Sequence, residues 1–245
     1  MKNIRLKKFI VIFIAGLIGV VTIAFSEIPL PEEIKKELLQ HTSQQILTLV
    51  ILINPTILLL VMTLLGLFLQ PKTNLKTPVI DQIVSVGYER INPGFFSYGL
   101  ALGFLTGIAI TFWSYLFYPY LPESIKSLNE NIELSVLTRI FYGGITEEIL
   151  LRYGFMTVLV WLFLKVKKSG ISYWTAIIFS SLVFGVGHLP IVYSTVESVD
   201  NLLILYIIFG NTIGGIAYGW LYWKKGLESA MIAHIMTHLT MITIQ

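Results

Sequence analysis

The sequence predicts an all-α membrane protein, a bundle of about seven transmembrane helices in one domain spanning residues 1–245. Three observations predict this fold class. The chain is 55% hydrophobic and only 13% charged, whereas about a quarter of the residues in soluble domains are charged. The apolar residues gather in runs near the roughly 20 residues that a helix needs to cross a bilayer. Basic and acidic loops alternate between these runs, as the positive-inside rule requires.

The first three runs are assigned in chain order. Residues 9–26 follow a basic tail like that of a signal peptide, but the run is long and lacks a small-x-small cleavage site before Glu27. We therefore expect a retained first helix. Residues 45–69 form the second helix and residues 97–120 the third. Between them, residues 70–96 contain three prolines and few apolar runs, which predicts a cytoplasmic linker.

The remaining four runs follow from residue 134 onward. Residues 134–164 exceed one perpendicular span and contain Gly143–Gly144, so we expect a tilt or a break into two helices there. Residues 172–190 form the fifth helix. Residues 202–223 form the sixth and carry four glycines at small-xxx-small spacing, which favours close helix–helix contact. Residues 226–244 form the seventh.

The charges of the loops predict the orientation and the surroundings of the chain. The N-terminal tail is basic and the next loop is acidic, and this alternation continues along the sequence. The N-terminus is therefore expected in the cytoplasm and the C-terminus outside. The pattern suits a bacterial inner membrane as well as an endoplasmic reticulum, and we expect a multi-pass protein of a bacterial cell membrane. The positive charges lie at helix ends and in loops, so the expected partner is the lipid bilayer and not nucleic acid.

Three of the apolar runs carry ionisable residues at helical spacing. They are Glu147-Glu148-x-x-x-Arg152, Phe184-x-x-x-His188 and His234-x-x-x-His238. A charged side chain at the bilayer centre costs about 2.5 to 3.5 kcal/mol even on the translocon-insertion scale. Three such segments in one small chain predict a shared polar site inside the membrane.

Spacing separates the two neighbouring glutamates. Glu148 and Arg152 are four residues apart and share a helix face, so a buried structural ion pair explains them. Glu147 is rotated by about 100° from Glu148. It therefore needs a partner from another helix or a water-filled cavity. A carboxylate in that position is suited to act as a general base.

Histidines supply the rest of the predicted site. Of four in the chain, only His41 lies outside the apolar runs. His188, His234 and His238 lie inside them, and Phe184 sits one turn before His188, where packing explains it. In one mechanism Glu147 and His188 polarise a water, and His234 donates to the oxyanion.

In a second mechanism a zinc ion activates the water. The chain has no cysteine, so any zinc ligands must be oxygen and nitrogen atoms. The candidate set is Glu147, His188, His234 and His238. His-x-x-x-His is suitable ligand spacing, but Ile235 stands where the zincin motif needs glutamate.

In their order along the chain, these motifs resemble the CPBP family. It contains CAAX-type proteases, among them the type II CAAX prenyl endopeptidases, and bacteriocin-processing or immunity proteins. The passage from Gly215-Ile216-Ala217-Tyr218-Gly219 to His234 resembles the family's last two helices as well. The resemblance covers about residues 134–244, the expected catalytic core, and leaves residues 1–133 unassigned.

The resemblance implies an intramembrane endopeptidase that cleaves a CAAX-like or membrane-anchored peptide. By position, Glu147 would activate water with His188, and His234 would form the oxyanion site. Glu148 and Arg152 would support this geometry. The implied mechanism is of the glutamate type, needing no metal, although the family was formerly classed as zinc-dependent. His238 departs from the family pattern, which has Asn or Asp there. It could keep the oxyanion role, add a metal ligand or mark altered activity.

Two other functions remain open from the sequence. A non-catalytic bacteriocin-immunity or membrane scaffold protein could carry the same motifs without using them for hydrolysis. A transporter or proton relay has less support, because the sequence has no inverted repeats with matched discontinuous segments.

Overall fold

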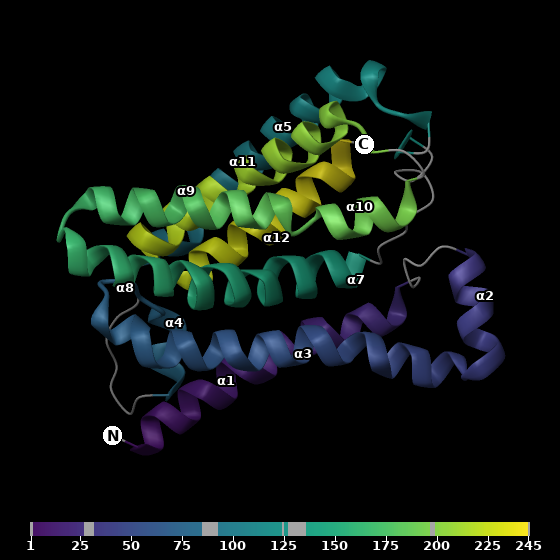
Figure 1. The fold of residues 1–245 in the computed structure, drawn as a ribbon. Coiled ribbons are helices and arrows are strands. Elements are labelled where there is room, and N and C mark those ends of the chain that lie inside the picture. Colours follow the sequence, from purple (N-terminus) through teal and green to yellow (C-terminus); the bar gives the residue numbers. More distant parts are fainter. Residues whose placement is uncertain are drawn as a thin grey trace.

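Seven helices of the described chain are long and apolar enough to cross a membrane (Figure 1). The structure is a computed structural model that describes residues 2–26, 32–84, 93–123, 125–126, 136–196 and 199–244. No strand occurs within these ranges. The prediction of an all-α bundle with about seven spans is therefore confirmed, and the seven predicted runs overlap these spans one to one: Asn3–Phe25, Gln44–Lys72, Gly94–Tyr120, Val136–Val166, Gly170–Ser194, Asn201–Lys225 and Leu227–Ile244.

The spans are built from α-helices with a few tighter or wider turns. In the span Val136–Val166, α7 and α8 are joined by two π-helical segments, Arg139–Glu147 and Ile149–Met156. We call this span the central helix. The α-helices are α1 (Lys2–Thr22), α2 (Glu32–His41), α3 (Gln44–Leu69), α4 (Pro78–Val84), α5 (Gly94–Phe117), α7 (Val136–Thr138), α8 (Thr157–Val166), α9 (Gly170–Val186), α10 (Leu189–Thr195), α11 (Asn201–Lys225) and α12 (Leu227–Ile244).

The central helix lies between two groups of helices (Figure 1). On one flank it packs against α1 and α3, which also contact each other. On the other flank it meets α9, α11 and α12, and α5 covers the far side of α12. Residues from the other two motif-bearing spans, Gly170–Ser194 and Leu227–Ile244, can therefore converge on one stretch of the central helix.

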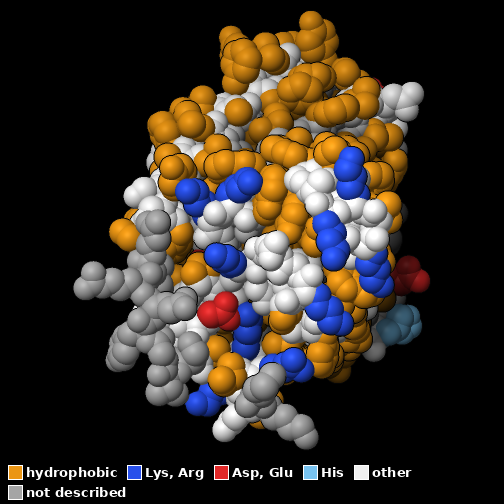
Figure 2. Space-filling model, turned by 90° about the vertical axis from the view of Figure 1, so that its left-hand side faces the viewer, with side chains coloured by type: hydrophobic (Ala, Val, Ile, Leu, Met, Phe, Trp, Pro, Cys, Tyr) orange, Lys and Arg blue, Asp and Glu red, His pale blue; other side chains and the backbone are white. Residues whose placement is uncertain are grey.

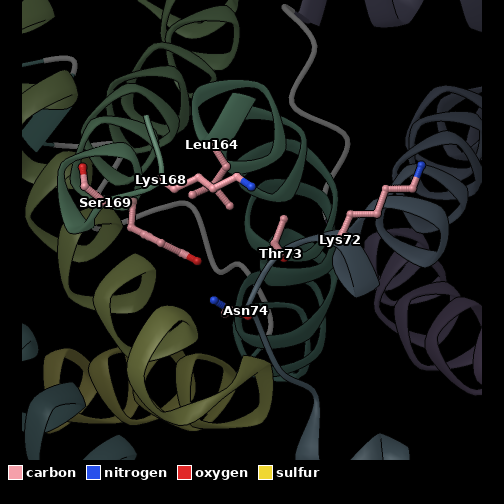
Figure 3. Close-up of a pocket in the computed structure, with 7 residues that line it drawn as sticks. Lys72, Thr73, Asn74, Leu164, Lys168 and Ser169 are labelled. Atoms are coloured by element: carbon pink, nitrogen blue, oxygen red, sulfur yellow. The ribbon is translucent and has the colours of Figure 1, made fainter. Parts of the chain in front are cut away.

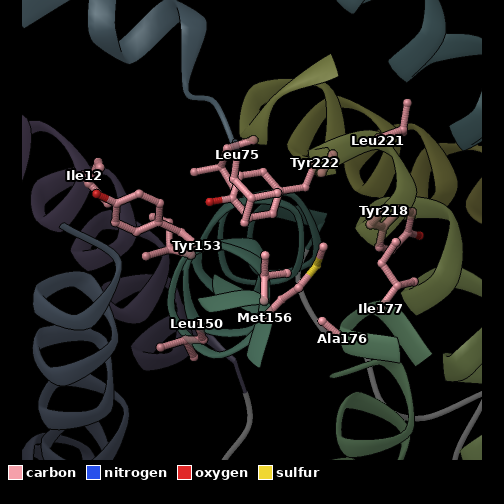
Figure 4. Close-up of a cluster of buried hydrophobic side chains, with 14 of the residues drawn as sticks. Ile12, Leu75, Leu150, Tyr153, Met156, Ala176, Ile177, Tyr218, Leu221 and Tyr222 are labelled. Atoms are coloured by element: carbon pink, nitrogen blue, oxygen red, sulfur yellow. The ribbon is translucent and has the colours of Figure 1, made fainter. Parts of the chain in front are cut away.

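The core gathers around the second half of the central helix (Figure 4). Leu150, Tyr153 and Met156 are buried there and pack with Ile177 of α9 and Tyr222 of α11. Since lipid tails are as apolar as these side chains, close packing and polar contacts, more than burial from water, hold such helices together. The outer faces of the spans remain apolar, as lipid contact requires.

Residues 70–84 of the predicted linker 70–96 are docked on the bundle, and residues 85–92 lie outside the described part of the chain. Leu75 and Ile80 join the main core. The ammonium of Lys8 lies 2.6 Å from the Asp81 carboxylate, which anchors α4 to α1. The Ile80 backbone N–H donates to the carboxylate of Glu228 at 2.8 Å and so ties α4 to α12. Periodicity could not reveal this docking, because it depends on contacts between distant parts of the chain.

The turn between α11 and α12 requires a glycine. Gly226 has φ of 108°, a left-handed conformation that side chains other than glycine adopt at a cost. A Cβ at this position would also meet the ring of Pro78 at 2.5 Å. The next residue, Leu227, donates its N–H to the carbonyl of Lys76 at 3.0 Å. Residues 76–80 therefore pack against this tight turn and the start of α12.

Lysine and arginine side chains gather over the end of the bundle where α1 begins (Figure 2). The spans Gln44–Lys72, Val136–Val166 and Asn201–Lys225 also end there. We call this the basic end. The positive-inside rule predicts that it faces the cytoplasm, in agreement with the expected orientation of the N-terminus, which stays a prediction.

Candidate active site

The polar site begins at an unusual stretch of helix. Between residues 139 and 156 the central helix is wider than an α-helix, and side-chain hydrogen bonds follow the wider turns. Thr146 Oγ1 donates to the carbonyl of Phe141, and Thr157 Oγ1 donates to that of Arg152, each five residues earlier. The helix does not break at Gly143–Gly144; it widens instead. Such π-helical turns are rare and frequent at functional sites, since they redirect side chains.

Glu148 forms the buried base of the site. Its side chain is fully buried, and Oε2 lies 3.4 Å from Nε of Arg152, which is also fully buried. The ion pair that the spacing predicted is therefore present. The other oxygen, Oε1, lies 2.9 Å from Nδ1 of His234. Glu148 thus joins the central helix to α12 and fixes the orientation of the His234 ring.

Glu147 faces the other nitrogen of the same histidine. Its Oε2 lies 3.9 Å from Nε2 of His234, and its side chain keeps 18% of its surface exposed. His234 is the partner from another helix that the sequence predicted for Glu147, and it lies between the two carboxylates. The 3.9 Å separation is too long for a direct hydrogen bond, but a water can be shared across such a distance.

Aromatic rings hold His234 from three sides. Tyr218 stacks on it at 4.5 Å between centroids with an interplanar angle of 21°. His238 stacks on it at 4.9 Å, also at 21°. Phe184 meets the ring edge-on at 5.9 Å. The ring has little freedom to rotate, so Nε2 remains directed at Glu147.

Tyr218 was not among the predicted site residues. Besides stacking on His234, it offers its ring face to the Arg152 guanidinium at 5.5 Å, a cation–π contact. In sequence it stands out only as a polar aromatic residue inside the glycine-rich stretch 214–219. The neighbouring glycines indicate close helix packing, and this interpretation does not distinguish Tyr218 from a packing residue.

His188 is connected to the site by its contacts with Phe184. Its Nδ1 lies 2.8 Å from the Phe184 carbonyl oxygen, which can only accept a hydrogen bond. Nδ1 therefore carries a hydrogen, and in the neutral ring Nε2 has a free lone pair. The Phe184 ring meets His188 edge-on at 4.9 Å and also lies 5.0 Å from the Arg152 guanidinium. No hydrogen bond or ion pair joins Glu147 to His188, both of which are described residues.

His238 occupies a space that only glycine leaves open. A Cβ built on Gly143 would lie 2.7 Å from Nε2 of His238 and 3.8 Å from Nε2 of His234. Nδ1 of His238 is buried and has no hydrogen-bond partner among the described residues. The extra size of histidine, compared with the asparagine or aspartate of the family pattern, is thus accommodated by Gly143.

Gly143→Ala is therefore expected to disable the site while leaving the bundle folded. The added methyl group must displace the His238 ring, and the stacked His234 ring moves with it. Because a 1 Å misplacement can cost about 10²-fold in rate, we expect a loss of at least roughly tenfold in activity.

Gly170→Ala is the matched control for this substitution. At that position the added methyl group would meet only Trp223, at 3.6 Å, an ordinary contact distance. Thermal unfolding and activity should be measured on both variants. Full activity in Gly143→Ala would contradict the packing described here.

The zinc alternative concerns the same side chains. Among the described residues, no group of three or more His, Asp or Glu side chains could hold a metal ion. A zinc ion held by Glu147, His188, His234 and His238 therefore stays a prediction from the sequence.

Comparison with known proteins gives one match. Residues 129–240 match the family model of the Rce1-like type II CAAX prenyl endopeptidases. No curated protein and no solved structure matches the chain. The matched segment agrees closely with the core expected at 134–244, and it contains all the site residues described above. Over residues 129–240, this multi-pass membrane chain is therefore similar to the Rce1-like type II CAAX prenyl endopeptidases, in agreement with the resemblance drawn from the motifs.

Proposed function

We propose that the chain hydrolyses a peptide bond of a membrane-anchored, CAAX-like substrate by a glutamate-type mechanism. Its family supports the coarser statement, an intramembrane endopeptidase of the CAAX type acting on a peptide or membrane-protein substrate. The observation that carries the finer proposal is His234 held between two carboxylates. Glu148 binds one ring nitrogen at 2.9 Å and Glu147 faces the other at 3.9 Å.

Glu147 is the general base in this proposal. It takes a proton from a water, and the water oxygen forms a bond to the carbonyl carbon of the scissile peptide. His188 accepts a hydrogen bond from the same water through Nε2, because Nδ1 is committed to the Phe184 carbonyl. When the carbon–nitrogen bond breaks, Glu147 returns the proton to the leaving amine.

His234 provides the oxyanion site. Its Nε2–H donates to the oxygen that becomes negative when the water attacks, and His238 stacks behind it. Nε2 carries a hydrogen when Nδ1 and Glu148 share a second proton across their 2.9 Å contact. Glu148 and Arg152 are thus positioning residues that act through His234. Phe184 packs between His188, His234 and Arg152.

Cleavage by the purified chain in liposomes tests this function. The substrate should be a peptide with a lipidated cysteine near its C-terminus, and the control should be the same peptide without the lipid. We expect cleavage of the anchored peptide and a loss of about 10²-fold or more in His188→Ala. If wild-type chain and variant are both inactive while the protein still protects cells against a bacteriocin, the immunity function replaces the enzymatic one.

Chelation is expected to leave the activity unchanged. In the proposed mechanism Glu147 and His188 alone activate the water, and no group of three or more His, Asp or Glu side chains among the described residues could hold a metal ion. Wild-type chain should be assayed after dialysis against a strong zinc chelator and again after zinc is restored. A loss on chelation that zinc reverses would contradict the glutamate-type mechanism.

A further inference from the structure

A pocket lies at the basic end, in a part of the bundle that the active site does not use. It has a volume of about 280 Å³ and is lined by residues from three places in the chain. These are the end of the second span (Lys72 to Asn74), the end of α8 and the start of α9. Because a water takes up about 30 Å³, the volume admits a small polar group with several waters.

The pocket is lined by hydrogen-bond donors and cations, and its lining contains no carboxylate. Figure 3 shows the side-chain nitrogens of Lys168 and Asn74 at the pocket, whereas Lys72 extends away from the other labelled residues. The Lys72 ammonium lies 5.7 Å from the centre of the Trp161 ring. Lys168 and Asn74 are therefore the side chains best placed to meet a ligand.

Ser169 adds an independent observation. Its Oγ is buried and has no hydrogen-bond partner among the described residues. Although Ser169 directly precedes α9, its side chain does not cap that helix. A buried hydroxyl without a partner is costly, so a ligand that reached Ser169 would offset this cost. The start of a 17-residue helix at the same place also favours negative charge.

The residues around the pocket are of the types that concentrate where helices leave the membrane. The spans Gln44–Lys72 and Val136–Val166 end here, and the span Gly170–Ser194 begins here. The Lys165 ammonium lies 3.5 Å from the centre of the Trp161 ring. Tyr173, which lines the pocket, stacks on Trp223 at 4.8 Å. Tryptophan, tyrosine and lysine concentrate at the level of lipid head groups.

We infer that this pocket binds a phosphate group, carried by an anionic lipid head group or present as free phosphate. Basic pockets between transmembrane helices bind anionic head groups in this way. The position at the boundary of three spans gives a lipid phosphate direct access from the bilayer. The inference rests on the basic end alone and is independent of the proposed catalysis.

Native mass spectrometry of the full chain in detergent micelles tests the inference. Phosphatidylglycerol, phosphatidylcholine or inorganic phosphate is added, and the bound fraction is measured. We expect phosphatidylglycerol to bind in preference to phosphatidylcholine. Lys168→Ala should lower its affinity about fivefold, the effect of one lysine near a charged membrane surface. Asn74→Ala should weaken it as well.

Lys167→Ala is the matched control, since Lys167 and Lys168 are both exposed but only Lys168 lines the pocket. It should bind phosphatidylglycerol like the wild-type chain, and all variants should unfold at similar temperatures. Binding of inorganic phosphate that depends on Lys168, without a preference for phosphatidylglycerol, would support the site and identify the free anion as its ligand. Equal losses in Lys167→Ala and Lys168→Ala, or no binding of either phosphate source, would overturn the inference.

Discussion

Glu147→Gln is expected to lower kcat/KM for peptide cleavage by about 10²–10⁴-fold, the usual contribution of a general base. Glutamine keeps the size of the side chain and can still hold a water, but it cannot take up the proton. The effect should fall on the chemical step because Glu147 keeps 18% of its side chain exposed and its contact with Nε2 of His234 is long, at 3.9 Å. Initial rates of cleavage in liposomes measure the loss of kcat/KM. Thermal unfolding shows whether the variant keeps the stability of the wild-type chain.

Glu228→Gln is the control for this substitution. Glu228 is also a buried glutamate in a membrane span, and its Oε1 accepts a hydrogen bond from the Ile80 backbone at 2.8 Å. A glutamine oxygen can accept the same bond, so activity should remain near that of the wild-type chain. More than a tenth of wild-type activity in Glu147→Gln would remove Glu147 from the role of base.

Arg152→Met is expected to lower the free energy of unfolding by about 3–5 kcal/mol, the cost of removing one partner of a buried ion pair. The fully buried guanidinium lies 3.4 Å from Glu148 and donates to the carbonyl of Gly215 at 3.2 Å. It also lies 5.0 Å from the centre of the Phe184 ring. Methionine fills part of the volume but leaves the Glu148 carboxylate without its cation.

Unfolding in mixed micelles, titrated with denaturing detergent, measures this loss. The double variant Glu148→Gln/Arg152→Met should recover part of the stability, since it removes the unpaired carboxylate. Lys225→Met is the control, because Lys225 is a partly exposed lysine whose ammonium lies over Tyr98, and changes of this kind usually stay within about 0.5 kcal/mol. A loss below about 1 kcal/mol in Arg152→Met would mean that the ion pair contributes little.

The spans could be predicted from the sequence because the bilayer fixes their length and composition. The pairing of Glu148 with Arg152 was also predictable, since it depends only on local spacing. The motifs indicated a family resemblance over about residues 134–244, and the family match at 129–240 overlaps this range. These successes share one cause: each depends on residues close together in the chain or on the membrane itself.

What the sequence missed depends on contacts between distant residues. A standard α-helix separates Glu147 from Glu148 by about 100°, and only the position of α12 reveals that His234 lies between them. The role of Tyr218 depends likewise on how α11 packs against α12. The anchoring of residues 70–84 by Lys8 and Glu228 needs two helices far away in sequence.

The tautomer of His188 is another feature that spacing could not supply. Only the 2.8 Å contact with the Phe184 carbonyl assigns the hydrogen to Nδ1 and leaves Nε2 as an acceptor. This assignment is the reason for proposing that His188 and Glu147 act on the same water, although no direct contact joins them. The proposal therefore makes a claim about coupling that single substitutions cannot test.

A double-mutant cycle of Glu147→Gln and His188→Ala tests that claim most directly. The value of kcat/KM should be measured for the wild-type chain, the two single variants and the double variant, all in the same liposomes. Residues that act as one unit are strongly non-additive, so we expect the double variant to be about as slow as Glu147→Gln alone. Two losses that multiply in the double variant would mean that the residues act independently, and a shared water would be ruled out.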